Sequence, residues 1–379
     1  MRSWLVSEPR LTWFPLSDAF EENGPNLFLL LRWDFRLVDT LYGREDDLQA
    51  ILNWAQGGST TATARLISGP GGAGKTRLAA SAAGILQSKG WSAGFLDTRS
   101  DVGDPESAAK GRFLIVDYPE EQPQRTAAVL EELAEIKTAP YPVRVIFLSR
   151  RPFETWEREA SILKGRLGRQ ELAALAPLTI EQGLLLIAEA ARTFADHARR
   201  PAPDLGAAVE WLGMSEIHRM PLYATAAAIH AVLSPQEAFG LGGPELLRQL
   251  ALRELGRVRN TSRALGLGEE GLERLLSLGV LANGLNEEAV RNLVGSRICG
   301  TEVTTDDVLS AIAKVPWWNR GRLMRLEPDL LAAAFLDRAL FSSFPQVELN
   351  FQTGSSWRSS EIRRHLSIGS VEFCMTSIW

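Results

Sequence analysis

The sequence predicts an α/β core, built as a parallel sheet with helices on both faces, followed by an all-α lid and a winged-helix-like helical domain. Three observations lead to this prediction. A glycine-rich loop at 69–76 stands between a strand-like and a helix-like segment. Buried-type strands alternate with amphipathic helices, which is the pattern of a parallel sheet with right-handed crossovers. From Leu178 onward the chain is almost entirely helix-forming.

An N-terminal arm is predicted over 1–40, where prolines and a glycine interrupt a segment rich in aromatic residues. The core is expected over 41–175. It begins with a helix from Arg44 to about Gln56, which ends at the glycines that follow. The other predicted elements of the core are strand 64–68, helix 77–86, strand 91–96, strand 113–116, helix 126–137 and strand 143–148.

The lid is predicted over 176–240, with helices at 180–197 and 222–232. The winged-helix-like domain is expected over 241–345, and strand-like pieces between Pro316 and Leu326 predict its wing. Residues 346–379 show no clear periodicity and are predicted to be a mobile tail or a truncated connection. The helices expected in the second domain are 245–258, 270–278, 287–294, 306–313 and 329–340.

The loop reads Gly-Pro-Gly-Gly-Ala-Gly-Lys-Thr and matches G-x-x-x-x-G-K-[ST] in full, so the core is predicted to be a P-loop NTPase core. Its glycines let backbone N–H groups surround a polyphosphate. The positive N-terminal end of the next helix attracts the same anion. Lys75 places an ammonium near the β- and γ-phosphates, and Thr76 offers a hydroxyl to Mg²⁺. We therefore expect ATP or ADP with Mg²⁺. The candidate nucleotide-binding residues here are Gly69, Gly71, Gly72, Ala73, Gly74, Lys75, Thr76 and Arg77.

The segment from Phe113 to Asp117 has four apolar residues followed by a carboxylate, which is the pattern of a Walker B strand. In this fold the carboxylate lies beside the loop lysine and can hold Mg²⁺, usually through water. Asp117 is therefore predicted to share the metal with Thr76. The alternative is an aspartate that caps a helix or a turn.

Hydrolysing ATPases often carry a glutamate directly after this aspartate, where the chain has Tyr118. Glu120 is the predicted substitute that orients water, with Glu121 as its nearest competitor and a solvated loop carboxylate as the alternative. At the tip of the next strand, Arg150 is predicted to sense the γ-phosphate, whereas Arg151 better fits a surface arginine. The predicted catalytic set is Lys75, Asp117, Glu120 and Arg150.

Taken in order, these motifs resemble the signal-transduction ATPases with numerous domains, the STAND class, which includes NB-ARC and NACHT proteins and is related to AAA+ ATPases. The segment from Leu41 to Glu45 looks like the hydrophobic-x-Gly-Arg-Glu motif in front of their ATPase core. The segment from Leu175 to Thr179 is similar to their link into the lid. Met220 to Leu222 resembles the lid motif G-x-P. The resemblance covers residues from about 41 to 340.

The resemblance implies that Gly43 and Arg44 border the adenine, that Pro221 packs on the base, and that Arg150 is the sensor arginine. Three departures stand out. His218 and Arg219 occupy the approach to Pro221, where the family usually has glycine. No Met-His-Asp motif occurs in the predicted winged-helix-like domain, so the family's histidine contact with ADP cannot be carried over. No solenoid is recognised after residue 345.

The function implied by the resemblance is that of a slowly hydrolysing ATP-binding switch. ADP would bridge core and lid in a closed state, and exchange for ATP would open the lid and promote self-association into a homo-oligomer. A protein or ligand activator that the sequence does not identify would bias the two states. Three alternatives stay open: an AAA-type motor or DNA-handling ATPase with a winged helix on DNA, a P-loop kinase, and a non-hydrolysing scaffold that keeps its nucleotide.

The composition limits the partners. Among 379 residues the formal net charge is −5 and the pI is near 5.6. This balance does not indicate a protein that coats nucleic acid or an acidic membrane, although it leaves room for local basic patches. No run approaches about 18 apolar residues, so no membrane span is expected. The two cysteines, Cys299 and Cys374, lack the spacing of a zinc site and suit a reducing compartment. A cytoplasmic protein is the expectation.

Overall fold

The protein divides into two compact units in its computed structural model. The first unit comprises Met1–Asp18 and Leu31–Gly243, and the second comprises Ala19–Leu30 and Pro244–Trp379. The segment 1–40, predicted as one arm, therefore contributes to both units, with Ala19–Leu30 packed in the second. The structure describes residues 9–22, 24–57, 62–96, 110–136, 141–156, 167–169, 175–295, 304–343, 350–351, 361–368 and 371–378.

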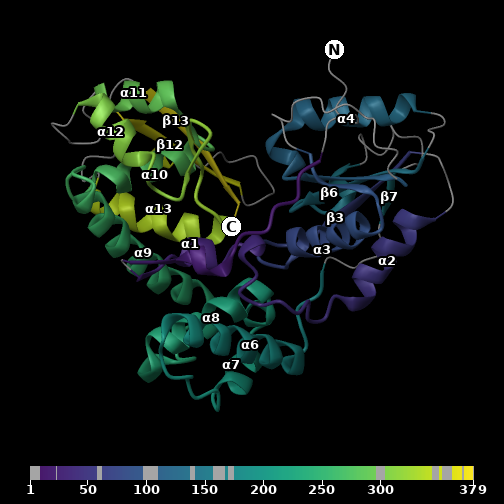
Figure 1. Ribbon diagram of the computed structural model, residues 1–379, viewed down its shortest axis with the longest axis horizontal. Helices are drawn as coiled ribbons and strands as arrows, with labels where there is room; N and C mark the ends of the chain where they lie inside the picture. Colours follow the sequence, from purple (N-terminus) through teal and green to yellow (C-terminus); the bar gives the residue numbers. More distant parts are fainter. Residues whose placement is uncertain are drawn as a thin grey trace. The chain divides into compact units, whose positions relative to one another are not determined.

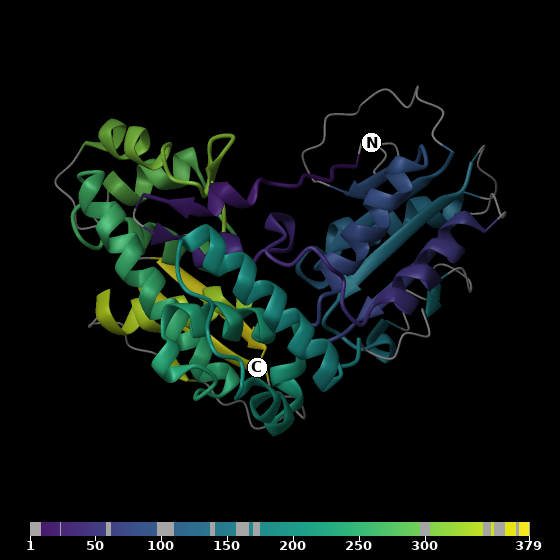
Figure 2. The same cartoon turned by 60° about the horizontal axis from the view of Figure 1, so that its bottom comes forward.

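The first unit is built on a five-stranded parallel sheet with the strand order β4-β5-β6-β3-β7 (Figure 2). Strand β6 lies between β3 and β5, and the carboxyl ends of these three strands are in register: Ser68 pairs with Ser149, and Asp117 with Leu148. The predicted P-loop, Walker B residue and sensor therefore lie along one edge of the sheet. The strands are β3 Thr63–Ser68, β4 Ser92–Phe95, β5 Arg112–Asp117, β6 Val143–Ser149 and β7 Leu167–Arg169.

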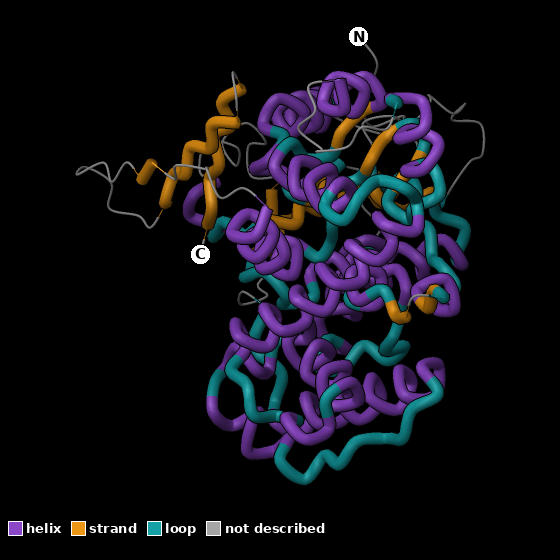
Figure 3. The backbone as a smooth tube through the Cα atoms, turned by 90° about the vertical axis from the view of Figure 1, so that its left-hand side faces the viewer, coloured by secondary structure: helices purple, strands orange, loops and turns teal. Residues whose placement is uncertain are grey.

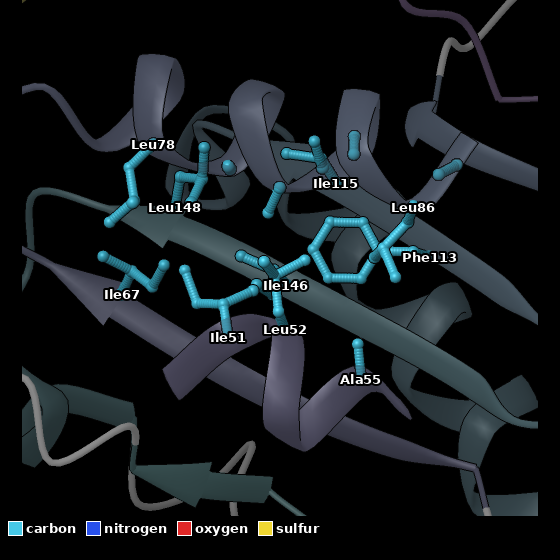
Figure 4. Close-up of a cluster of buried hydrophobic side chains, with 14 of the residues drawn as sticks. Ile51, Leu52, Ala55, Ile67, Leu78, Leu86, Phe113, Ile115, Ile146 and Leu148 are labelled. Atoms are coloured by element: carbon cyan, nitrogen blue, oxygen red, sulfur yellow. The ribbon is translucent and has the colours of Figure 1, made fainter. Parts of the chain in front are cut away.

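Helices cover both faces of this sheet (Figure 1). Helices α2 (Glu45–Gln56) and α3 (Lys75–Ser88) pack on one face, where their apolar side chains meet every second residue of the strands (Figure 4). Helix α4 (Pro123–Glu135) covers the other face with Val129, Leu130 and Leu133. The predicted α/β P-loop NTPase core with two helical layers is confirmed.

The lid follows in the same unit as helices α6 (Ile180–Ala198), α7 (Ala208–Met214) and α8 (Pro221–Leu233). Thr179 and Gln182 form a capping box at the start of α6, so the side chain of each accepts from the backbone N–H of the other. Helix α8 is alanine-rich and mostly buried, as expected for a helix that is apolar all round. Helix α7 was not predicted.

The second unit contains a winged-helix arrangement. Its elements follow the order helix, strand, helix, helix, strand, strand, and the three short strands pair in the order β8-β10-β9. Arg322 pairs with Asn286 on one side and Asn319 on the other, so the predicted wing is the hairpin β9-β10. The elements are α10 Gly271–Leu281, β8 Leu285–Asn286, α11 Glu287–Gly295, α12 Thr305–Ile312, β9 Trp318–Asn319 and β10 Arg322–Leu323.

The N-terminal piece of this unit is anchored by polar and aromatic contacts. The backbone N–H of Leu27 donates to the buried Glu254 carboxylate at 3.0 Å, and Glu21 pairs with Arg257 at 2.8 Å. Phe28 packs edge-on against Phe335. The elements are β1 Phe20–Glu21, β2 Gly24–Pro25, α1 Leu27–Leu30, α9 Gly243–Ala264 and α13 Asp329–Ser343.

The C-terminal stretch contains an antiparallel sheet in which β11 (Asn350–Phe351), β12 (Glu361–Ile368) and β13 (Val371–Ile378) lie in that order (Figure 3). These strands were not predicted, because serines and charged residues interrupt the apolar alternation of this stretch. No helix among the described residues is both long enough and apolar enough to cross a bilayer. The short 3-10 helices are Leu16–Ala19, Trp33–Phe35, Pro119–Glu121, Phe153–Trp156, Glu216–Arg219 and Pro235–Glu237.

Candidate nucleotide-binding site

The glycine-rich loop connects β3 to α3, as the motif requires. Gly72 and Gly74 adopt positive φ angles of 80° and 90°, which only glycine adopts at little cost, and Gly74 caps α3. The N–H of Gly69 donates to the Ser149 carbonyl at 3.2 Å, which ties the start of the loop to the tip of β6. Of the other loop residues, Ala73 is fully buried in the core and Gly71 is half-buried.

Lys75 lies inside the loop and is 8% exposed. Its Nζ donates to the carbonyl oxygens of Gly69 at 2.7 Å and Pro70 at 2.9 Å. Both acceptors belong to the loop itself, so the loop curls around its own ammonium group. This arrangement gathers a full positive charge at the N-terminal end of α3, where an anion is favoured by the helix dipole as well.

Thr76 and Asp117 meet across the sheet edge. Thr76 Oγ1 donates to Asp117 Oδ2 at 3.0 Å, and the other carboxylate oxygen accepts from the N–H of Tyr118 at 3.1 Å. A hydroxyl and a carboxylate are hard oxygen donors that suit Mg²⁺, which usually takes few protein ligands and completes its shell with phosphates and water. Among the described residues no group of three or more acidic, histidine or cysteine side chains could hold a metal, so an ion here would depend on the phosphates.

Tyr118, Glu120 and Arg150 form a second cluster beside Asp117. Tyr118 is in the left-handed region with φ 50° and ψ 54°, a conformation that costs a non-glycine residue on the order of 1 kcal/mol. The Arg150 guanidinium lies over its ring at 5.1 Å, and the Arg150 N–H donates to Glu120 Oε1 at 2.9 Å. Glu120 Oε2 is buried without a hydrogen-bond partner among the described residues.

This cluster separates the predicted site residues from their competitors. The carboxylate of Glu120 points to the strand tip that carries Arg150, whereas Glu121 is exposed. Arg151 is also exposed, and its N–H donates to Ser149 Oγ. The structure therefore brings Glu120 and Arg150 together beside Tyr118, the residue after Asp117, while their roles in water orientation and charge sensing stay predictions.

Arg44 is a structural link between the loop and the lid. Its guanidinium donates to the carbonyl oxygens of Gly43 at 2.9 Å, Ala73 at 3.3 Å and Ala176 at 2.7 Å. Burial lowers the pKa of Arg44 from the usual arginine value. A Cβ on Gly43 would lie 2.6 Å from Gln182 Oε1 at the start of α6, and the backbone there has φ 62°, so a side chain would displace Gln182 and strain the backbone.

Arg77 contacts the N-terminal segment of the first unit. Its guanidinium donates to the carbonyl oxygens of Trp33, Val38 and Asp39 at 3.2, 3.0 and 2.8 Å, and it also lies over the ring of Trp13. Burial, and then the nearby charge of a second arginine, lower its pKa to about 10. Through these three hydrogen bonds Arg77 fixes α3 to the N-terminal segment. The contact of Arg77 with a nucleotide stays a prediction.

The start of α8 rests on the loop. The N–H of Leu222 donates to the Gly72 carbonyl at 3.2 Å. A Cβ on Gly72 would lie 3.0 Å from Leu222 Cβ, and one on Gly74 would lie 3.6 Å from Pro221 Cγ. Pro221 thus lies near the loop. Its packing on a base stays a prediction.

Sequence reasoning missed Glu189, which fixes the lid to the linker ahead of the core. Its carboxylate accepts from the N–H of Asp39 at 2.6 Å and from the hydroxyl of Tyr42 at 2.7 Å. Burial raises the pKa of Glu189, but the hydrogen bonds from Tyr42 and Asp39 outweigh it and lower the pKa overall. Nothing in the sequence distinguishes this glutamate from a solvated one on an amphipathic helix.

No protein-family model matches this sequence, and a search of curated proteins finds no match. Solved structures to which the fold is similar include Cdc6p from Pyrobaculum aerophilum, which is 12% identical, with a TM-score of 0.36 over 82% of this chain and 97% of that chain. Another is the Orc1 protein of Aeropyrum pernix, solved in complex with DNA, which is 16% identical, with a TM-score of 0.36 over 84% of this chain and 96% of that chain. Both likenesses concern the fold alone.

Proposed function

We propose that this protein is an ATP-binding molecular switch of the STAND type, in which exchange of ADP for ATP controls domain arrangement and self-association. The loop binds the phosphates, Thr76 and Asp117 hold Mg²⁺, and hydrolysis is slow and resets the switch. An activator, either a protein or a small ligand, shifts the balance between the two states by binding one of them better.

The observation that carries this proposal is the direct contact between loop and lid. Leu222 donates to Gly72 inside the loop, and Arg44 connects Ala73 to Ala176 where the lid begins. A nucleotide that reshapes the backbone of the loop must therefore change contacts of the lid. In a P-loop kinase, groups of the lid would have to reach a second substrate. Here the start of α8 contacts the loop itself, which favours a lid that responds to the nucleotide.

Slow chemistry is supported by the residue after Asp117. Tyr118 cannot take a proton from water at neutral pH, because a phenol is not a base there. Glu120 is the nearby carboxylate, and one of its oxygens is already engaged by the Arg150 N–H. Hydrolysis through Glu120 would need a rearrangement of that contact, which favours a long-lived ATP state.

The test is nucleotide content after gentle purification, together with the turnover rate of the intact chain. The proposal expects bound ADP and very slow turnover. Lys75→Ala should abolish nucleotide binding, because it removes the ammonium group from the loop. Tight binding by that variant would eliminate the site assignment, and rapid turnover would eliminate the switch.

A DNA-handling ATPase is the second candidate, favoured by the winged-helix arrangement in the second unit. Proteins of this type insert the N-terminal residues of a helix into the major groove. Here the third helix of the arrangement, α12, begins with Asp306 and Asp307 in its first turn, and these carboxylates would face phosphates of like charge. ATP turnover measured with and without duplex DNA separates the candidates, since stimulation by DNA is expected only for the second.

A further inference from the structure

The connector between the two units is held by two side chains of the lid. Leu241 to Gly243 are the last residues of the first unit, and α9 begins at Gly243 and continues into the second. Trp211 Nε1 donates to the Leu241 carbonyl at 2.7 Å, and the N–H of Gly243 donates to His218 Nε2 at 3.1 Å. A segment with glycines at 240, 242 and 243 would otherwise be free to adopt many conformations.

The imidazole of His218 is fixed on every side. Its Nδ1 lies 2.7 Å from the Trp211 carbonyl and must donate there, which leaves Nε2 as the acceptor for Gly243. The ring stacks on the Trp211 indole with centroids 4.0 Å apart and planes 1° from parallel. Trp211 is 1% exposed and His218 is 5% exposed, so both rings are buried inside the lid.

Gly243 fits this clamp because it has no side chain. A Cβ there would lie 3.0 Å from Tyr223 Cδ1 and 3.3 Å from Ile217 Cγ2. A Cβ on the neighbouring Gly242 would meet no atom of the described residues within 4 Å. The contact is therefore specific to one of two adjacent glycines, which supplies a matched pair of substitutions.

The same short segment also contacts the P-loop. His218 lies four residues before Leu222, whose N–H donates to the Gly72 carbonyl. Between them, the carbonyl of Arg219 accepts from the N–H of Leu178 at 3.0 Å. Tyr223, which packs on Gly243, directly follows Leu222. One stretch of the lid, residues 217–223, thus contacts the loop through Leu222 and faces the connector through His218 and Tyr223.

We infer that His218 is a positioning residue that transmits the state of the P-loop to the connector. This inference rests on the proposed switch. When ADP is replaced by ATP, a change in the contact between Leu222 and Gly72 moves the segment 217–223, and the bond between His218 and Gly243 opens. Leu241 to Gly243 then gain conformational freedom, because the N–H of Gly243 is no longer held by the lid.

The experiment is amide hydrogen exchange of the peptide that contains Leu241 to Gly243, in the full chain, with Mg-ADP or with a Mg-bound non-hydrolysable ATP analogue. In the wild type, exchange should be faster with the analogue. In His218→Phe, which keeps a stacking ring but has no acceptor, exchange with ADP should rise about tenfold, the effect of losing one buried hydrogen bond, and should no longer depend on the nucleotide.

Gly243→Ala should behave like His218→Phe, whereas Gly242→Ala should behave like the wild type, which keeps the test valid if the histidine variant does not fold. Nucleotide affinity is measured alongside. If the wild type binds neither nucleotide, the proposed function fails and the inference with it. If it binds both and the His218→Phe and Gly243→Ala variants keep the nucleotide-dependent difference, only the inference is overturned.

Discussion

Replacing Arg44 by methionine should loosen the first unit at the junction of core and lid. The change removes two hydrogen bonds between distant segments, to Ala73 and Ala176. Each hydrogen bond to a charged group contributes about 1.5–3 kcal/mol, and their loss is partly offset because a buried guanidinium no longer has to be dehydrated. Arg44 Nε, buried without a partner among the described residues, adds to that relief. The expected net loss is about 2 kcal/mol.

Hydrogen exchange in graded urea is the suitable assay, because a chain of two units need not unfold in one transition. The peptides that cover the start of α2 and the link near Ala176 should open at lower urea in Arg44→Met. Arg44→Lys is the control: it keeps the charge but replaces the longer, planar guanidinium, whose Nη2 donates to both carbonyls, with a compact ammonium, so an intermediate effect is expected. Equal opening free energies in Arg44→Met and wild type, within about 0.5 kcal/mol, would refute the reasoning.

Three further outcomes are expected. Gly72→Ala puts a Cβ against Leu222 in a left-handed conformation, so it should weaken the loop–lid contact by about 1–2 kcal/mol, read as faster exchange in α8. Tyr118→Glu supplies a carboxylate directly after Asp117 and should raise ATP turnover on the order of tenfold, with Tyr118→Phe as the control; unchanged turnover would count against the role of this position. The pKa of Glu189 is lowered in the folded protein, so the ionised carboxylate stabilises the fold above the ordinary carboxyl pKa, and this contribution is lost as pH falls through the lowered value. The melting temperature of Glu189→Gln should therefore depend less on pH between about 3 and 7 than that of the wild type.

Most elements of the core were predictable because each has a local signal, whereas the three-residue strand β7 was not predicted. A loop motif between strand and helix and two continuous apolar strands fix the parallel sheet, and the observed β5 and β6 extend the predicted strands by one or two residues. In the second unit, helix α9 departs from its prediction, since it runs to Ala264 although its predicted end is 258. Contacts from the next helix, α10, support the extension: Ser262 Oγ accepts from the N–H of Leu272, and Arg259 pairs with Glu273. Such support is not visible in the local sequence.

The site divides along the same line. Lys75, Thr76 and Asp117 were predictable because their chemistry is carried by their own side chains and by their place after a strand. The role of Arg44 was not, because its acceptors are backbone carbonyls, which every residue has. His218 was noticed as a departure from the family pattern, yet its partner is the N–H of a glycine 25 residues later. Only the folded lid brings the two together.

Affinity and lifetime should separate in a switch built this way. If Tyr118 limits hydrolysis and the contact at Gly72 reports the nucleotide, then Tyr118→Glu should shorten the ATP state without changing how the lid responds to it. Gly72→Ala should do the reverse and leave the hydrolysis rate nearly unchanged once nucleotide is bound. Because the two residues act on different steps, the double variant should show both effects additively. A strong interaction between the two substitutions would mean that the lid contact and the chemistry are one device, and that exchange alone does not set the state of the protein.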